Sequence, residues 1–351
     1  MNRVLDRPDP IIRADALTYV RFARRDPEAM RRFLLDFGFV ETHEAGFFRC
    51  HGDGPAWAVH VAAGGDAFLG FGLAAATPED FDRFVAATGA NVEAMDGPAR
   101  GRRATLRDPD GISVELVDAV PVAAMSTMPP QTNVNAPGRS GRVNAPVRPD
   151  LAAAPVYRMG HVVLQRGDFE TTARWYMRHF GLVPSDIQTL PDGTPALGFF
   201  RLDRGDRPAD HHTLAILGGP HSALLHVSTE TSDIDALGQG HQYLRARGWR
   251  HHWGIGRHRL GSQLFDYWKD PAGAEWEHYA DGDVMDASYP TGYHALERGS
   301  LWTWGDDLPD SMRPRPTLRM LWTLLRSSPA QRRAMKAAKQ ALSVPPRPWL
   351  R

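Results

Sequence analysis

Two turns of nearly the same composition constrain the fold of this chain more than any other feature. Asp108-Pro109-Asp110-Gly111 and Asp270-Pro271-Ala272-Gly273 lie 162 residues apart, and each separates two segments of strand character. Asp, Pro and Gly are favoured by tight turns, so each motif predicts a β-hairpin. The pairs Phe37-Gly38 and Phe180-Gly181 also repeat, 143 residues apart, at the ends of amphipathic segments. An internal duplication is the economical interpretation.

Each half of the chain contains two units that begin with a strand and a helix. In the first half, predicted strands at 17–22 and 68–73 precede predicted helices at 26–37 and 77–87. In the second half, strands at 159–164 and 223–228 precede helices at 168–179 and 233–248. Short strands follow every helix, so the pattern predicts four βαβββ-like units in an α+β fold.

The composition between the halves changes at residues 119–155, which are rich in Pro, Asn, Gly and Ala and lack periodicity. This segment is typical of a linker. We therefore predict a lead-in at 1–13, an N-terminal domain at 14–118, a second domain at 156–285 and an extension at 286–351. The last 41 residues carry ten basic and no acidic residues, but their apolar positions favour a helical tail that packs or makes a subunit contact.

Charge and hydropathy exclude several classes of protein. Hydrophobic residues make up 42% and charged residues 23% of the chain, as in soluble globular proteins. The formal net charge of 0 gives no general attraction to nucleic acid or acidic lipid. No apolar run is long enough to span a membrane, and the first residues lack a signal peptide core. The single Cys50 excludes an internal disulfide and fits a cytoplasmic protein.

Three side chains stand out in apolar strands of the second half: His161, His226 and Glu277. Acidic residues are depleted in strands and are rarely buried without a partner, so Glu277 requires one. Two histidines and one carboxylate on one face would hold a divalent metal and leave coordination positions open. Spacing alone favours the alternative of buried, hydrogen-bonded structural histidines.

The duplication favours the metal hypothesis. We align Thr18 with His161, and Phe71 or Gly72 with His226, whereas Glu115 alone matches its counterpart Glu277. The same architecture therefore forms in the first half without the histidines, which suggests that they serve chemistry. Glu115, without histidine partners, is expected to be structural.

The second half resembles the type I extradiol ring-cleaving dioxygenases of the vicinal oxygen chelate superfamily. The motifs that carry the resemblance are the segments 160–164 (GHVVL), 210–215 (DHHTLA), 225–227 (LHV), 256–258 (GRH) and 267–277. The resemblance extends over about residues 14–305. It implies two tandem domains, each of two βαβββ modules in a partly open barrel, with a degenerate N-terminal and a catalytic C-terminal domain.

The resemblance also implies roles for individual residues. His161, His226 and Glu277 would be the ligands of Fe(II), with Mn(II) as the other candidate metal. His211 would act in acid/base chemistry beside the metal, and His258 and Tyr267 would hydrogen-bond the substrate hydroxyls. The neighbour of His211, His212, is expected to point to the opposite face and to be structural. Apart from the resemblance, Phe199 and Phe200 are candidates for a wall of the substrate pocket, with core packing as the alternative, and Trp302 and Trp304 are candidates to cover the pocket.

The implied activity is Fe(II)-dependent extradiol (meta) cleavage of a catechol-type aromatic diol, with both atoms of O2 incorporated, in the degradation of aromatic compounds. A cytoplasmic homo-oligomer is implied. Two alternatives use the same scaffold. One is another enzyme, either glyoxalase-like, with a second glutamate ligand, or 4-hydroxyphenylpyruvate dioxygenase-like. The other is a metal-free protein that binds an aromatic compound and confers resistance.

Overall fold

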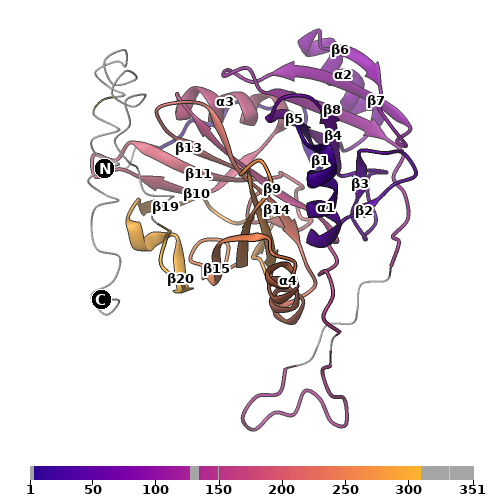
Figure 1. The fold of residues 1–351 in the computed structure, drawn as a ribbon. Helices are drawn as coiled ribbons and strands as arrows, with labels where there is room; N and C mark the ends of the chain where they lie inside the picture. The colour runs from indigo at the N-terminus through magenta and orange to yellow at the C-terminus, as the bar shows by residue number, and fades with distance from the viewer. Residues whose placement is uncertain (1–3, 127–133, 149, 310–331, 333–351) are drawn as a thin grey trace.

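A computed structural model describes residues 4–126, 134–148, 150–309 and 332 of the chain. Figure 1 shows two sheet-rich halves side by side, with the linker extending away from both. The predicted α+β class is confirmed, and each half contains two βαβββ modules.

The first sheet has eight strands from two modules. The elements of the first module are β1 (Ala14–Arg24), α1 (Pro27–Phe37), β2 (Val40–Glu41), β3 (Phe47–Arg49) and β4 (Val59–Ala63). Those of the second are β5 (Ala67–Ala75), α2 (Pro78–Thr88), β6 (Asn91–Ala94), β7 (Gly101–Arg107) and β8 (Ser113–Ala119). The order β2-β3-β4-β1-β5-β8-β7-β6 places β1 and β5, the first strands of the modules, side by side and antiparallel.

The second sheet repeats this plan with ten strands. The elements of its first module are β9 (Arg158–Arg166), α3 (Phe169–Phe180), β10 (Val183–Thr189), β11 (Pro195–Arg201) and β13 (Leu214–Gly218), and the short β12 (Ala209–Asp210) before β13 lies outside this sheet. Those of its second are β14 (Ala223–Glu230), α4 (Ile234–Ala246), β15 (Arg250–His258), β16 (Leu264–Lys269) and β17 (Glu275–Ala280). In the order β19-β10-β11-β13-β9-β14-β17-β16-β15-β20, the first strands β9 and β14 again pair antiparallel.

The repeated sequence signals have local physical causes. The Asp26 side chain accepts a hydrogen bond from the Ala29 backbone at the start of α1, as helix N-caps do. Gly38 and Gly181 end α1 and α3 in the left-handed conformation, with φ of 105° and 69°. Glycine adopts this conformation without the strain that a Cβ would add, which explains the repeated Phe-Gly pairs.

The predicted lead-in packs against the second half of the chain. Leu5 and Ile12 are buried, and Arg7 and Arg13 both bind Asp203 of the second half. Apolar burial and this shared carboxylate therefore attach the start of the chain to the second sheet.

The chain after β17 also forms regular secondary structure. It contains β18 (Val284–Met285), β19 (Gly292–Ala295), the 3-10 turn η1 (Arg298–Ser300) and β20 (Trp302–Gly305). Strands β19 and β20 form the two edges of the second sheet. The predicted basic helical tail lies outside the described residues. None of the helices in the described ranges is long and apolar enough to cross a membrane.

Each of the two duplicated hairpin turns binds an arginine of the other half. Asp270 Oδ1 accepts hydrogen bonds from the Ala272 and Ala274 backbones at 2.9 Å, while its Oδ2 lies 2.6 Å from Nη2 of Arg24 at the end of β1. Both side chains of this ion pair are almost fully buried. One carboxylate oxygen therefore stabilises the turn, and the other binds across the interface between the halves.

The opposite hairpin makes the equivalent contact. Asp108 Oδ1 accepts hydrogen bonds from the backbones of Asp110 and Ile112, and Oδ2 accepts one at 3.0 Å from Nε of Arg166, the last residue of β9. Tyr176 donates to the same oxygen. The two duplicated turns thus make equivalent contacts across the interface.

One apolar core continues through both halves. Trp276 on β17 is fully buried, and its ring contacts those of Phe22, Phe33 and Phe37 from the first half. Burying a large aromatic side chain contributes roughly 1.5–3 kcal/mol or more. Side chains of the first half therefore contribute to the apolar core of the second half.

We expect Asp270→Ala to lower the free energy of unfolding by about 3–5 kcal/mol, because it leaves the buried Arg24 charge unpaired. The change also removes two hydrogen bonds of the turn. Chemical denaturation measures the loss. As a control, Asp82→Ala removes an exposed partner of Arg102 and should change stability by less than about 0.5 kcal/mol. A loss below about 1 kcal/mol for the Asp270 variant would contradict this account.

The interface also predicts a pH dependence. His278 on β17 donates from Nε2 to the Phe37 carbonyl at 2.7 Å, and burial lowers its pKa to about 4. Below its ordinary pKa of about 6.5, the unfolded chain binds a proton that the folded chain does not. Stability should therefore be fully present above about pH 6.5 and fall between that pH and about pH 4. His278→Gln should reduce this pH-dependent loss in denaturation experiments; an unchanged slope would count against the assignment.

Candidate metal centre

The three predicted ligands converge from neighbouring strands of the second sheet. His161 lies on β9, His226 on β14 and Glu277 on β17, and these strands are adjacent in that order. Glu277 pairs with Ser228, two residues after His226 on β14. Since side chains two residues apart on a strand share a face, Glu277 and His226 leave the same side of the sheet.

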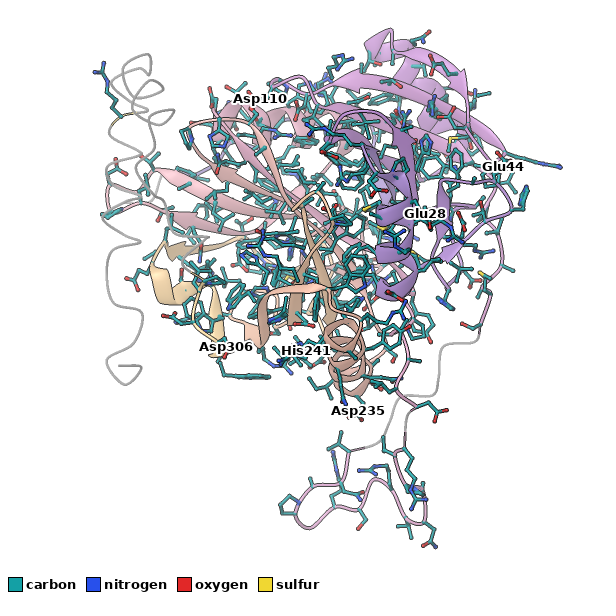
Figure 2. The ribbon with its side chains drawn as sticks, in the orientation of Figure 1. Glu28, Glu44, Asp110, Asp235, His241 and Asp306 are labelled. Carbon is teal, nitrogen blue, oxygen red and sulfur yellow. The ribbon has the colours of Figure 1, made fainter. Side chains whose placement is uncertain are left out.

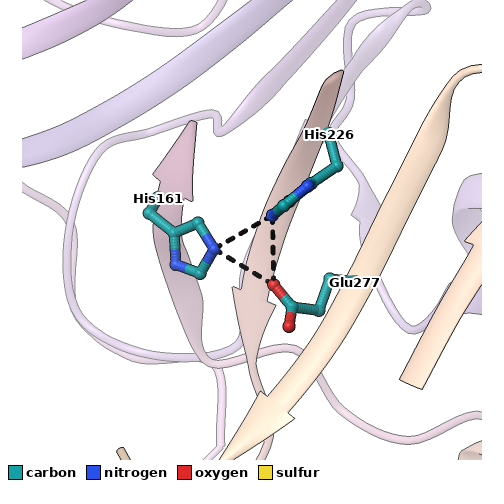
Figure 3. A group of neighbouring side chains, drawn as sticks. All are labelled: His161, His226 and Glu277. Carbon is teal, nitrogen blue, oxygen red and sulfur yellow. Dashed lines mark hydrogen bonds and ion pairs between the residues drawn. The ribbon is translucent and has the colours of Figure 1, made fainter. Parts of the chain in front are cut away.

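The ligand atoms have the spacing of a common coordination sphere (Figure 3). Nε2 of His161 lies 3.2 Å from Nε2 of His226 and 3.1 Å from Oε2 of Glu277, and the remaining pair is 3.5 Å apart. A divalent ion bound at about 2.0–2.2 Å holds adjacent ligand atoms roughly 3 Å apart. The three side chains therefore form a candidate site for one metal ion.

Glu277 carries the strongest sign that a cation belongs there. Its side chain is fully buried, yet Oε2 has no hydrogen-bond partner, although His161 Nε2 is only 3.1 Å away. Burying a carboxylate oxygen without a partner is costly. If the lone pairs of Glu277 Oε2 and His161 Nε2 both pointed at one metal ion, the two atoms would lie this close without forming a hydrogen bond.

The protonation states also suit metal binding. Burial raises the pKa of Glu277, but the imidazoles of His161 and His258 outweigh this effect and hold the pKa well below its ordinary value. Burial lowers the pKa of His226 to about 4, which keeps its imidazole neutral near pH 7. Metal ligands must be deprotonated, so both residues are ready to coordinate.

A second cluster of two histidines and one carboxylate differs from the candidate metal site in its hydrogen bonds. His241, His251 and Asp266 also lie within ligating distance of one another. There, Oδ1 of Asp266 is 2.8 Å from His251 Nε2 and 3.1 Å from His241 Nδ1, while Oδ2 accepts a hydrogen bond from Trp268 Nε1 at 2.6 Å. Both oxygens have partners, so this cluster needs no ion.

The equivalent position in the first half is filled by protein groups. Glu115 pairs with Gly72, which also pairs with Tyr19, just as Glu277 pairs with Ser228. This register places Tyr19 at the position of His161, one residue from the Thr18 that the sequence had suggested. It also places Gly70, and not Phe71 or Gly72, at the position of His226.

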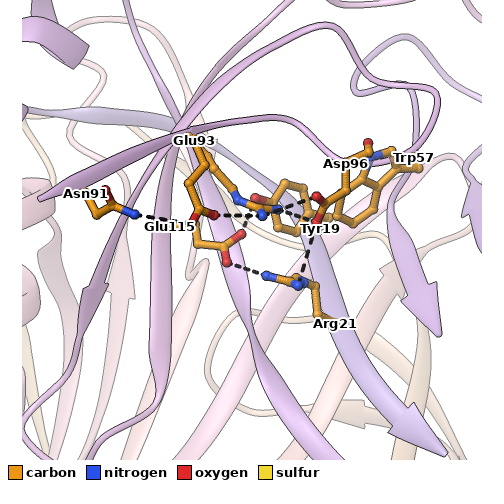
Figure 4. A network of polar contacts seen from close by, with 8 residues as sticks. Tyr19, Arg21, Trp57, Asn91, Glu93, Asp96 and Glu115 are labelled. Carbon is orange, nitrogen blue, oxygen red and sulfur yellow. Dashed lines mark hydrogen bonds and ion pairs between the residues drawn. The ribbon is translucent and has the colours of Figure 1, made fainter. Parts of the chain in front are cut away.

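These substitutions satisfy the first-half carboxylate (Figure 4). Glu115 accepts a hydrogen bond from the Tyr19 hydroxyl at 2.5 Å on one oxygen and from Arg21 Nη1 at 2.6 Å on the other. A phenol and a guanidinium thus take the place of a metal. The structure therefore supports the expectation that Glu115 is structural.

His258 and Tyr267 lie together beside the candidate ligands. His258 Nδ1 lies 2.9 Å from the Leu301 carbonyl, which can only accept, so Nδ1 carries the proton. Its Nε2 is 2.9 Å from the Tyr267 hydroxyl and 3.3 Å from Glu277 Oε1. Burial and then the charge of Glu277 raise the pKa of Tyr267 well above its ordinary value, so the phenol stays protonated.

The positions of His211 and His212 differ from the prediction. The ring of His212 packs against that of the candidate ligand His161, with the two planes tilted by 39° and the centroids 4.0 Å apart. His211 instead binds Asp186, with Nε2 2.7 Å from Oδ2. Both histidines precede β13 in a loop, where the strict alternation of a strand does not apply. We therefore correct the expected assignment: His212 is the histidine that adjoins the ligands.

The predicted pocket residues are only partly placed beside the site. Phe199 lies near the His212 ring, at 5.1 Å between centroids, whereas Phe200 is fully buried in the main core. Trp304 is 45% exposed on the edge strand β20, so its predicted pocket role is not supported. Its neighbour Trp302, the other candidate for this role, is buried.

Tyr267 belongs to a cluster of mainly aromatic side chains that the sequence pattern did not reveal. Figure 2 draws the side chains of both halves on the ribbon. The members of the cluster are Trp253, Phe265, Tyr267, Trp302 and Leu308. Trp253 stacks with Tyr267 at 5.4 Å, and Phe265 stacks with His258 at 4.2 Å. The alternation of Phe265 and Tyr267 along one strand was a signal in the sequence that they share a face.

Comparisons with known proteins agree with this geometry. Residues 158–278, which include all three candidate ligands, match the family described as Glyoxalase/Bleomycin resistance protein/Dioxygenase superfamily. The chain is 32% identical over 205 residues to Metapyrocatechase 2 of Cupriavidus necator, covering 58% of this chain and 60% of that protein. It is 32% identical over 167 residues to an iron-dependent extradiol dioxygenase of Rhodococcus jostii, covering 44% and 53%. The chain thus spans 60% or less of the length of these two curated relatives.

Solved structures share the fold. An extradiol ring-cleaving dioxygenase from Brevibacterium fuscum superposes with a TM-score of 0.70 at 20% identity, covering 89% of this chain and 86% of that chain. A Mn(II)-bound glyoxalase from Novosphingobium aromaticivorans gives 0.69 at 22% identity, covering 87% and 95%. Together, these comparisons show a match of residues 158–278 to the Glyoxalase/Bleomycin resistance protein/Dioxygenase superfamily, a similarity of sequence to extradiol dioxygenases and a fold shared with solved members of that group.

Proposed function

We propose that this chain is an Fe(II)-dependent extradiol dioxygenase that cleaves a catechol-type aromatic diol with O2. The observation that carries the proposal is the triad of His161, His226 and Glu277, in which Oε2 of the buried Glu277 has no hydrogen-bond partner. The adjacent pair of His258 and Tyr267 supplies polar groups for a diol. The names of the relatives support the same chemistry.

A ferrous ion held by two histidines and one carboxylate would offer open positions to two adjacent substrate oxygens and to O2, and would lower the pKa of a bound hydroxyl. Mn(II) prefers similar ligands and is the second candidate.

Protein groups would orient the diol. The Tyr267 phenol is protonated and can donate to a substrate oxygen that has lost its proton. His258, whose Nδ1–H is fixed by the Leu301 carbonyl, presents Nε2 beside both Tyr267 and Glu277. Trp253 and Trp302 are buried next to Tyr267 and would exclude water from this side.

His212 is the proposed acid/base residue in place of His211. Its ring contacts a ligand, and an imidazole can accept a proton from a substrate hydroxyl and return it later. Burial lowers the pKa of His212 well below its ordinary value, so the ring is neutral before it takes up a proton.

A panel assay tests the activity against the two alternatives. The protein, reconstituted anaerobically with Fe(II), is mixed with catechol, 3-methylcatechol, dihydroxybiphenyl and carboxylated catechols, and O2 is then admitted. We expect a yellow ring-fission product from at least one diol. Isomerisation of a glutathione adduct of an α-ketoaldehyde would instead favour the glyoxalase-like enzyme. Tight binding of an aromatic compound by a protein that retains no metal would favour the resistance protein.

His226→Ala should abolish iron retention and lower turnover by at least about 10³-fold, because removing one of three ligands destroys the site. Iron content after gel filtration and the rate of diol cleavage are the measurements. His241→Ala is the matched control, since it removes a histidine from the cluster that needs no ion, and it should retain iron. Unaltered circular dichroism shows that both variants fold. Iron retained at wild-type level without His226 would refute the ligand assignment.

A further inference from the structure

We propose that Asp186 and His211 are positioning residues that fix the tautomer of His212, so that its Nε2 carries a lone pair. The consequence for catalysis rests on the proposed function, but the tautomer itself is a property of the metal-free protein.

A continuous chain of short contacts leads inward from the surface to a metal ligand. Nε2 of His294 lies 2.6 Å from Asp186 Oδ1, and Asp186 Oδ2 lies 2.7 Å from Nε2 of His211. His211 Nδ1 is 3.0 Å from Nδ1 of His212, whose ring packs against that of His161. Asp186, His211 and His212 are all buried, and only the His294 side chain, at 44%, is largely exposed.

The direction of each hydrogen bond follows from the carboxylate. An ionised carboxylate only accepts, so His211 must donate from Nε2. A neutral His211 then has its lone pair on Nδ1, and the contact at 3.0 Å requires His212 to donate from Nδ1. This leaves the lone pair of His212 on Nε2, the ring nitrogen remote from His211. A base in this state can accept a proton without first losing one.

The ionised state of Asp186 has a local cause. Burial raises its pKa, but hydrogen bonds from His211 and His294 outweigh burial and hold the pKa below its ordinary value. A carboxylate with a donor on each oxygen is a fixed acceptor.

Two glycines make room for this arrangement. A Cβ on Gly292 would stand 2.1 Å from Asp186 Oδ1, and a Cβ on Gly261 would stand 2.8 Å from His211 Nδ1. Gly292 lies on β19, which pairs with β10 directly at Asp186. The backbone is therefore shaped around the carboxylate and the imidazole, which argues that the chain of contacts is a built feature of the fold.

Asp186→Asn tests the proposal, because it preserves shape while adding an amide that can donate. If the introduced side-chain amide donates to His211 Nε2, the His211 proton moves to Nδ1, and His212 then carries its proton on Nε2. Two-bond ¹H–¹⁵N correlation spectra of histidine-labelled, metal-free protein distinguish the two tautomers, and the spectrum of His212→Gln assigns the signals. We expect His212 Nδ1–H in the wild type and Nε2–H in Asp186→Asn.

His294→Gln is the control, since it leaves the charge of Asp186 in place and should leave the His212 tautomer unchanged. A wild-type His212 protonated on Nε2 would overturn the proposal, even if Asp186→Asn did not fold. In an Asp186→Asn protein whose His211 tautomer has reversed, an unchanged His212 tautomer would overturn it as well.

Kinetics separate this proposal from the proposed function. At equal iron content, Asp186→Asn should lower kcat by about 10²–10⁴-fold, the usual contribution of a general base, with KM changed little. If the wild type cleaves a diol and Asp186→Asn has the same kcat, the positioning role is refuted and the proposed function is not. The expected tautomers in a protein that cleaves no diol would instead refute the dioxygenase and leave the positioning intact.

Discussion

The Asp270 carboxylate is the contact on which the geometry of the second half depends. One oxygen closes the hairpin turn through two backbone amides, and the other binds Arg24 of the first half in a buried ion pair. The turn sets the register between β16 and β17, which places Tyr267 opposite Glu277. The same side chain therefore attaches the hairpin to the first half and aligns a proposed metal ligand with its neighbouring phenol.

Three buried carboxylates show how the chain distinguishes a metal site from a structural one. Glu115 is satisfied by a phenol and a guanidinium, and Asp266 by two imidazoles and an indole. Only for Glu277, among these three, is an oxygen left without a hydrogen-bond partner. Because the cost of burying a charged oxygen is similar in each place, the missing partner points to a cation. Residue composition alone does not separate these sites, since Asp266 also has two histidine neighbours.

The extension after the second domain takes part in the site. The Leu301 carbonyl fixes the proton on His258, Trp302 packs in the aromatic cluster, and His294 reaches Asp186 from β19. These contacts come from the two strands at opposite edges of the second sheet and from the turn between them. The extension therefore orients groups around the candidate metal site from both sides.

Sequence by itself determined the duplicated architecture, because turn residues and helix caps act locally and repeat at fixed intervals. It also selected His161, His226 and Glu277, because polar residues in apolar strands are unusual and the first half lacks the histidines. Only the tertiary structure decided between His211 and His212, since these residues lie in a loop where no period relates sequence to side-chain direction. Likewise, Asp186 lies 25 residues from His211, and their contact exists only because strands from distant segments assemble into one sheet.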